Sequence, residues 1–138
     1  MQMAEIYRTI QIPGTLTTSY QNSSGYGWYT RLPAGFLYYI EDAYFYAATT
    51  VAKDTTNGEV FYLKDEDGNT IASLSGHATA LTGTGTAFAS FSSTYREIDA
   101  TSAAKWVKLC YVTSGSGQQP IDAQVILRIA VKRSGTAA

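Results

Sequence analysis

The sequence predicts an all-β protein: an antiparallel β-sandwich of two sheets, jelly-roll-like, with eight or nine strands. The first observation is the composition, with 11 tyrosines, 12 glycines and only 3 prolines in 138 residues. Tyrosine and threonine suit a pleated, half-exposed surface, while glycine and serine suit tight connections. The second is that turn signals separate short apolar segments at intervals of roughly ten residues. An immunoglobulin-like sandwich is the alternative, but the single Cys110 cannot supply its paired cysteines.

Length and charge limit the class of protein. We expect one domain over residues 1–138, with 1–14 as an N-terminal arm or edge strand and 134–138 as a short tail. A hydrophobic content of 45% with a net charge of -1 excludes disorder and argues against a nucleic-acid-binding role. Because no apolar run approaches the roughly 20 residues of a membrane helix, we expect no membrane span. Residues 1–5 carry no signal-peptide pattern, so we expect no secretory leader.

Two strands, with at most one weak edge strand between them, are predicted in the first 32 residues. Apolar residues alternate over residues 4–12, and they share one face with Arg8; Pro13 and Gly14 should end this strand. Residues 15–27 are polar and small, which predicts a loop with at most one weak edge strand. Residues 28–32 form the next candidate, closed by a Pro-Ala-Gly turn.

Aromatic and β-branched residues dominate the segment 36–51, which predicts two strands or one strand bent near Glu41 and Asp42. Asn57-Gly58 is a hairpin signal, since both residues tolerate the positive φ of a type I′ turn. It predicts a reversal between this segment and a strand over 59–64. A second hairpin is expected where residues 65–69 turn the chain into 70–74.

The next segments are less regular. Residues 76–85 predict an exposed loop, residues 86–91 a strand, and residues 93–99 either a strand or one helical turn. Residues 105–112 are apolar on both faces, so we expect a central strand there, followed by a Ser-Gly-Ser-Gly turn over 114–117.

The last predicted strand has the clearest pattern of the chain. Six apolar residues recur at every second position between residues 121 and 131, and polar residues fall between them. This alternation is typical of a strand with one buried face. The apolar positions are Ile121, Ala123, Val125, Leu127, Ile129 and Val131.

No metal or cofactor site follows from the sequence. Asp65, Asp67 and Asn69 resemble the start of an EF-hand loop, but Thr70 stands where the loop needs glycine and Gly76 where it needs glutamate. We interpret the segment as a hairpin turn, with a weak calcium site shared with a neighbouring loop as the alternative. One histidine and one cysteine cannot fill a structural zinc site.

The search for catalytic residues yields no convincing group. A dyad of Cys110 and His77 is the formal candidate, but a buried, inert thiol and a solvated imidazole explain both residues better. Glu97 and Asp99 would share one face of a strand, without a sign of burial. We therefore predict that the protein is not an enzyme.

The excess of tyrosine is the most informative feature for function. More tyrosines are present than a core of this size needs, so some should contact water or a partner. They can be ordinary half-buried residues, part of a protein–protein interface, or a stacking platform for sugars. Our candidate interface residues are Tyr7, Tyr20, Tyr26, Trp28 and Tyr29.

Three segments resemble small β-sandwich virion proteins of tailed bacteriophages, especially capsid decoration (cement) proteins. They are residues 32–36 (Leu-Pro-Ala-Gly-Phe), residues 58–74 with the Asp-Gly-Asn turn, and residues 105–131 with the Ser-Gly-Ser-Gly loop. The resemblance implies a structural protein, made in the host cytoplasm, that binds the lattice of the major capsid protein on the capsid surface. It also implies a homo-oligomer, with a trimer favoured, and no catalytic residue. The alternative is a carbohydrate-binding module or a phage fibre and receptor-binding domain.

Overall fold

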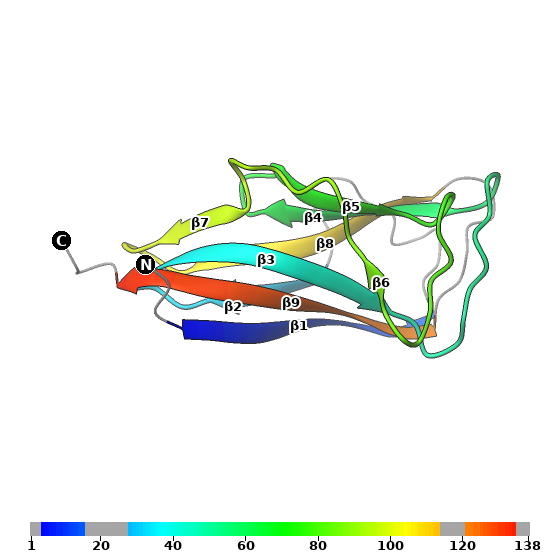
Figure 1. The fold of residues 1–138 in the computed structure, drawn as a ribbon, viewed down its shortest axis with the longest axis horizontal. Helices are drawn as coiled ribbons and strands as arrows, with labels where there is room; N and C mark the ends of the chain where they lie inside the picture. The colour runs from blue at the N-terminus through cyan, green and yellow to red at the C-terminus, as the bar shows by residue number, and fades with distance from the viewer. Residues whose placement is uncertain (1–3, 16–27, 114–120, 135–138) are drawn as a thin grey trace.

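The computed structural model describes residues 4–15, 28–113 and 121–134, and the strands of these ranges stack as two antiparallel sheets (Figure 1). In the described part of the chain no helix is long and apolar enough to cross a membrane. The strands of these ranges are β1 (Ala4–Thr15), β2 (Trp28–Leu32), β3 (Phe36–Tyr46), β4 (Glu59–Asp65), β5 (Thr70–Ser75), β6 (Thr86–Ala87), β7 (Glu97–Ala100), β8 (Lys105–Thr113) and β9 (Ile121–Ser134).

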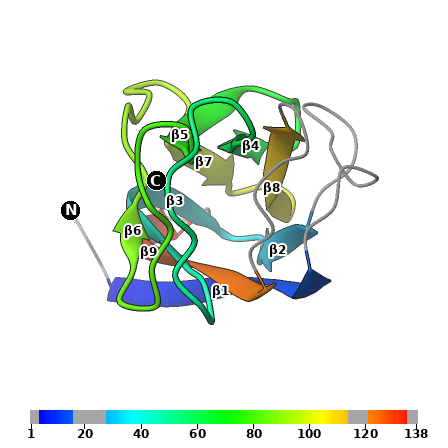
Figure 2. The same ribbon diagram turned by 90° about the vertical axis from the view of Figure 1, so that its right-hand side faces the viewer.

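Strand pairing is nested, so that the first strand pairs with the last, and the jelly-roll prediction is confirmed. β1 pairs with β9, β2 with β8, β3 with both β6 and β7, and β4 with β5. The chain is thus one long hairpin folded into two layers, with the orders β1-β9-β3-β6 and β2-β8-β4-β5. Figure 2 shows β4, β5 and β8 in one layer and β1 and β9 in the other.

The core lies between the two sheets. In β9 the apolar positions 123, 125, 127, 129 and 131 are all buried, as the period-two pattern predicts. Phe45 of β3 meets Phe61 of β4 across the layers at 4.6 Å between ring centroids, and Phe61 also contacts Tyr111 of β8. One side of the sandwich is closed by residues 86–92, where Phe88 N–H donates to Ala43 of β3 and Ala89 pairs with Ser73 of β5.

A β-bulge in β3 keeps its apolar side chains on the inner face. Ile40 pairs with Ile129 and Asp42 with Arg128, so Glu41 is the extra residue. The bulge reverses the alternation, and the buried positions change from even numbers (38, 40) to odd ones (43, 45). Of the two sequence alternatives, the single bent strand is confirmed.

Arg96 holds this bulge from outside the strand. Its guanidinium donates to the carbonyl oxygens of Ile40 (3.0 Å) and Glu41 (2.9 Å). It also lies over the rings of Tyr39 and Phe91, at 4.6 and 4.5 Å from their centroids. The carbonyl groups that the bulge disturbs therefore acquire a charged donor.

The predicted hairpin at Asn57-Gly58 is wrong, because β3 and β4 lie in different sheets. The local turn is made instead by Asp54, whose carboxylate accepts the backbone N–H groups of Thr56 and Asn57, both at 2.9 Å. Gly58 is required for close approach: a Cβ at this position would lie 2.7 Å from the Asp54 carbonyl oxygen and 3.1 Å from His77 N. The glycine signal was thus steric and was not a sign of positive φ.

Several other strand boundaries agree with the sequence prediction or correct it. The β4–β5 hairpin is confirmed, with Gly68 at φ +89° in its turn, and β8 is central, between β2 and β4. β1 does not end at Pro13 but continues through a register shift to Thr15. The strand predicted over 86–91 is only two residues long, because the chain there crosses between the sheets.

The structure corrects the prediction for residues 76–85 and combines the two alternatives predicted for residues 93–99. The segment 76–85 is not wholly exposed, since Leu81 is buried and exchanges backbone hydrogen bonds with Val51. Residues 93–99 form a turn and then β7, so each alternative holds for part of the segment. The weak edge strand within 15–27 and the 114–117 turn lie outside the described residues, apart from Thr15 in β1.

Replacing Arg96 tests the importance of the bulge. Arg96→Ala should lower the free energy of unfolding by about 2–3 kcal/mol, because two hydrogen bonds from a charged donor are lost. Arg96→Lys should recover only part of this, since an ammonium lacks the planar fork. Urea denaturation is the measurement, with the exposed Arg31→Ala as control; an equal effect of both alanine variants would contradict this role.

Asp54 should contribute to the pH dependence of stability. The backbone N–H groups of Asn57 and Thr56 hold the pKa of its carboxyl below the ordinary 3.8. A lowered folded-state pKa means that the contribution is complete above pH 3.8 and is lost as the pH falls below it. Asp54→Asn should therefore reduce the loss of stability between pH 7 and pH 3, measured by urea denaturation. Asp67→Asn is the control, and an equal change there would refute the assignment.

Candidate functional site

The outward surface of the β1-β9-β3 layer is one of two candidate binding faces. Cross-strand register aligns its side chains in three rows: Tyr7–Arg128–Asp42, Thr9–Ile126–Tyr44 and Gln11–Gln124–Tyr46. Tyr7 is 59% exposed and Tyr44 is 40% exposed. We name these nine residues the tyrosine face. Their position follows from strand alternation, with the β3 bulge setting the phase for Tyr44 and Tyr46.

Arg128 is the centre of a charge cluster on the tyrosine face. Its guanidinium donates to Asp42 through two nitrogens and to Glu5 at 3.0 Å, and it lies 3.7 Å from Glu41. The Tyr7 hydroxyl donates to the second carboxylate oxygen of Glu5, at 3.2 Å. Hydrogen bonds to Asp42 and Glu5 raise the pKa of Arg128 above its ordinary value, so it keeps its charge. The cluster fixes the orientation of Tyr7 beside a permanent cation.

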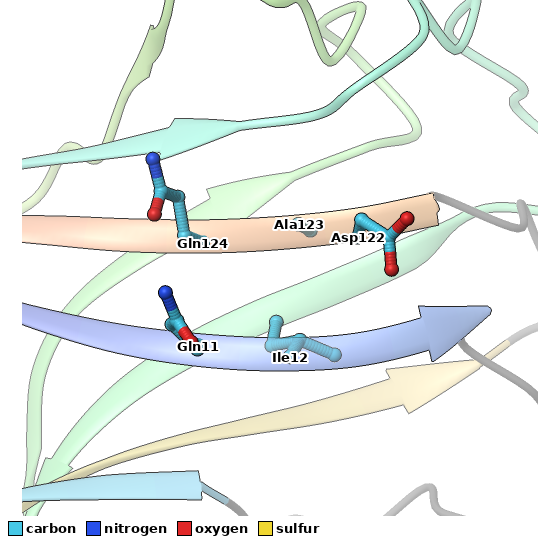
Figure 3. Close-up of a pocket in the computed structure, with 5 residues that line it drawn as sticks. All are labelled: Gln11, Ile12, Asp122, Ala123 and Gln124. Atoms are coloured by element: carbon cyan, nitrogen blue, oxygen red, sulfur yellow. The ribbon is translucent and has the colours of Figure 1, made fainter.

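A hollow of about 210 Å³, lined by both polar and apolar side chains, lies at one end of this face (Figure 3). Gln11 and Gln124 are cross-strand partners, and Figure 3 shows both amide groups on the same side of the sheet. Asp122, at the start of β9, also lines the hollow and has a positive φ of 46°. Two amides and a carboxylate offer both donors and acceptors to a polar ligand.

The second face is the outward side of β2, β8 and β4. Tyr29 is 60% exposed and meets Trp106 edge to face, with ring centroids 4.9 Å apart. Lys64 lies over the ring of Tyr62 on the same side of the sheet. We name this set the aromatic–basic face: Tyr29, Arg31, Tyr62, Lys64, Trp106 and Lys108.

The structure does not bring the sequence-predicted interface residues together. Tyr7 points outward from one sheet and Tyr29 outward from the other, on opposite sides of the molecule. Trp28 is half-buried and stacks on Tyr111, with ring planes 7° apart. The remaining two candidates, Tyr20 and Tyr26, lie outside the described residues.

Sequence reasoning also left several exposed residues of these faces unassigned. Tyr44, Arg128 and Trp106 lie within predicted strands but are not among the five candidate interface residues. A usable signal was present for Arg128, since it occupies an outward position in the best-patterned strand. Its carboxylate partners could not be identified in advance, because Glu5 and Asp42 are 123 and 86 residues away in sequence.

The hairpin interpretation of Asp65 accounts for its oxygens. One accepts the backbone N–H groups of Asp67 (3.0 Å) and Asn69 (2.8 Å), and the other accepts the Asn69 side-chain amide. Within the described ranges no three His, Cys, Asp or Glu side chains are grouped as metal ligands. The segment is therefore a turn stabilised by its own first residue.

The formal catalytic pair occupies two different settings. Cys110 is buried in β8, and burial raises the pKa of its thiol, with Lys108 and Lys64 acting in the opposite direction. A raised pKa lowers the thiolate fraction at neutral pH. His77 Nδ1 lies 3.3 Å from the Thr55 carbonyl oxygen, in the turn beside Gly58.

Against models of protein families, curated protein sequences and solved structures, the chain gives no match.

Proposed function

We propose that the protein is a structural virion protein, a capsid decoration (cement) protein of a tailed bacteriophage. The observation that supports this most directly is the exposure of tyrosines on opposite sides of one sandwich, with Tyr7 and Tyr44 on one face and Tyr29 on the other. Tyrosine, tryptophan and arginine are the residues enriched in protein interfaces. A molecule with two such faces can join two neighbours at once.

The proposed mechanism is bridging by repeated contacts. Each face alone offers a few aromatic side chains, which suits a contact of moderate strength. Repetition around a symmetry axis converts such contacts into strong binding, because later contacts form within an already assembled complex. We therefore expect a homo-oligomer, with a trimer favoured, bound to the lattice of the major capsid protein. In this proposal the protein is made in the host cytoplasm and ends on the capsid surface.

Binding to assembled shells tests the proposal. Particles purified from the native source should contain the protein in a copy number proportional to that of the coat protein, by quantitative mass spectrometry. Added to shells depleted of it, Tyr7→Ala and Tyr44→Ala should each bind at least about tenfold more weakly, as truncation of a hot-spot tyrosine costs about 2 kcal/mol or more.

Tyr95→Ala is the matched control. Tyr95 is also 40% exposed, but it lies in the turn before β7 and belongs to neither face. An equal loss of binding in this variant, or absence of the protein from purified particles, would contradict a decoration role.

A carbohydrate-binding or receptor-binding module is the second candidate, and the hollow of Figure 3 favours it. Gln11, Gln124 and Asp122 can exchange hydrogen bonds with sugar hydroxyls, and Tyr46 follows Gln124 in the same cross-strand row. The ring of Tyr46 is held against Gly85, where a Cβ would lie 2.8 Å from a ring carbon. An aromatic ring beside convergent polar groups is a suitable platform for a sugar.

A glycan array distinguishes the two candidates. If the hollow binds sugars, wild type should retain specific glycans and Gln124→Ala should reduce their binding about tenfold, since the sugar loses a hydrogen-bonding partner. The exposed Thr70→Ala of β5, in the other sheet, should bind as wild type does. A blank array would exclude this candidate and leave the capsid assay unaffected.

A further inference from the structure

A mostly apolar cavity of about 350 Å³ lies at the end of the sandwich where β1 begins, beside the turn between β2 and β3. Its walls include Ile6 of β1, Phe36 and Tyr38 of β3, and Val131 of β9. The Tyr38 hydroxyl donates to the Pro33 carbonyl oxygen at 2.8 Å, which fixes the turn over the cavity. This volume is near the lower end of the range for small-molecule sites, roughly 300–1,000 Å³.

Arg8 is the one charged residue in this lining. It is the cross-strand partner of Leu127, a buried residue, so it occupies an inward position of β1. Among the described residues, no carboxylate lies within ion-pair distance of Arg8, and its guanidinium donates only to the neighbouring Tyr7 carbonyl oxygen, at 3.3 Å. Arg8 is half-buried and its hydrogen bond to Tyr7 is exposed, so the guanidinium is open to a ligand; an anion in the cavity would supply the charged acceptor that Arg8 lacks among the described residues.

We propose that this cavity binds a small amphiphilic carboxylate, with its hydrocarbon chain against Ile6, Phe36 and Val131 and its carboxylate on Arg8. The planar guanidinium can hold both oxygens of a carboxylate at once. Charge complementarity selects an anion, and the apolar walls select a hydrocarbon body. This site is separate from both binding faces and independent of the proposed virion role.

Arg8 could also have a simpler role, because an inward charge on an edge strand discourages pairing with the strands of other chains. This role has to be distinguished from carboxylate binding. Protection against edge pairing needs only a positive charge, so Arg8→Lys would fully preserve this protection. A carboxylate site needs the planar fork, so Arg8→Lys should weaken binding. The apolar cavity is an observation that the simpler role leaves without explanation.

The probes are sodium octanoate and 1-octanol, titrated into the chain of residues 1–138 below the micelle concentration of octanoate. Two-dimensional NMR should show saturable shifts at Ile6, Arg8, Tyr38 and Val131, with octanoate bound at least tenfold more tightly than octanol. Arg8→Gln should abolish this preference, Arg8→Lys should reduce it, and Arg31→Gln on the outward side of β2 should preserve it.

Filling the cavity provides a second, independent variant. Ile6→Trp should abolish the binding of both probes, and Ala4→Trp, at the exposed start of β1, serves the same purpose if the first variant does not fold. Equal affinity for octanoate and octanol would assign the cavity to an uncharged side chain of a partner and overturn the proposal. Absent shifts at these residues, or an unchanged preference in Arg8→Gln, would overturn it as well.

Discussion

The contact between Arg96 and the carbonyl oxygens of the β3 bulge is the interaction on which both the core and the tyrosine face depend. The bulge at Glu41 changes the phase of β3, so that Phe45 points into the core while Tyr44 and Tyr46 point outward. Without the bulge, Tyr44 and Tyr46 would face the core, and Asp42 would lose its position beside Arg128. The one extra residue in β3 thus determines both which of its side chains fill the core and which lie on the tyrosine face.

The nested pairing of strands explains why distant segments form this surface. β1 and β9 come from opposite ends of the chain, and β3 pairs with β9 from the other side. Arg128 therefore lies between Glu5 on one neighbour and Asp42 on the other. The Glu5 contact lies within the β1–β9 pair of the long hairpin, whereas the Asp42 contact requires the hairpin to have folded over, because it joins β3 to β9. The tyrosine face therefore depends on the strand order and cannot be assigned to any single segment.

This separation between local and distant information explains what the sequence could predict. The alternation in β9 and the Asp-Gly-Asn turn are local patterns, and both elements were predicted correctly. Asn57-Gly58 is also a local pattern, but a glycine can be required either for a positive φ or for close packing. The packing of Gly58 against His77 involves a residue distant in sequence, so the pattern alone could not distinguish the two. The opposite orientation of Tyr7 and Tyr29 depends on the order of strands in two sheets. Their proximity in a tyrosine-rich N-terminal third therefore gave no information about a shared face.

The contacts of Arg128, Arg96 and Arg8 differ in how well they explain the position of each charge in the fold. Arg128 is surrounded by carboxylates, and Arg96 is occupied by two carbonyl oxygens and two aromatic rings. Each has a structural role that its contacts explain. Arg8 has a single backbone contact among the described residues, yet it faces the interior side of its strand. Because this half-buried guanidinium lines an apolar cavity and has no carboxylate within ion-pair distance among the described residues, the two together suit a molecule that combines a hydrocarbon chain with an anion.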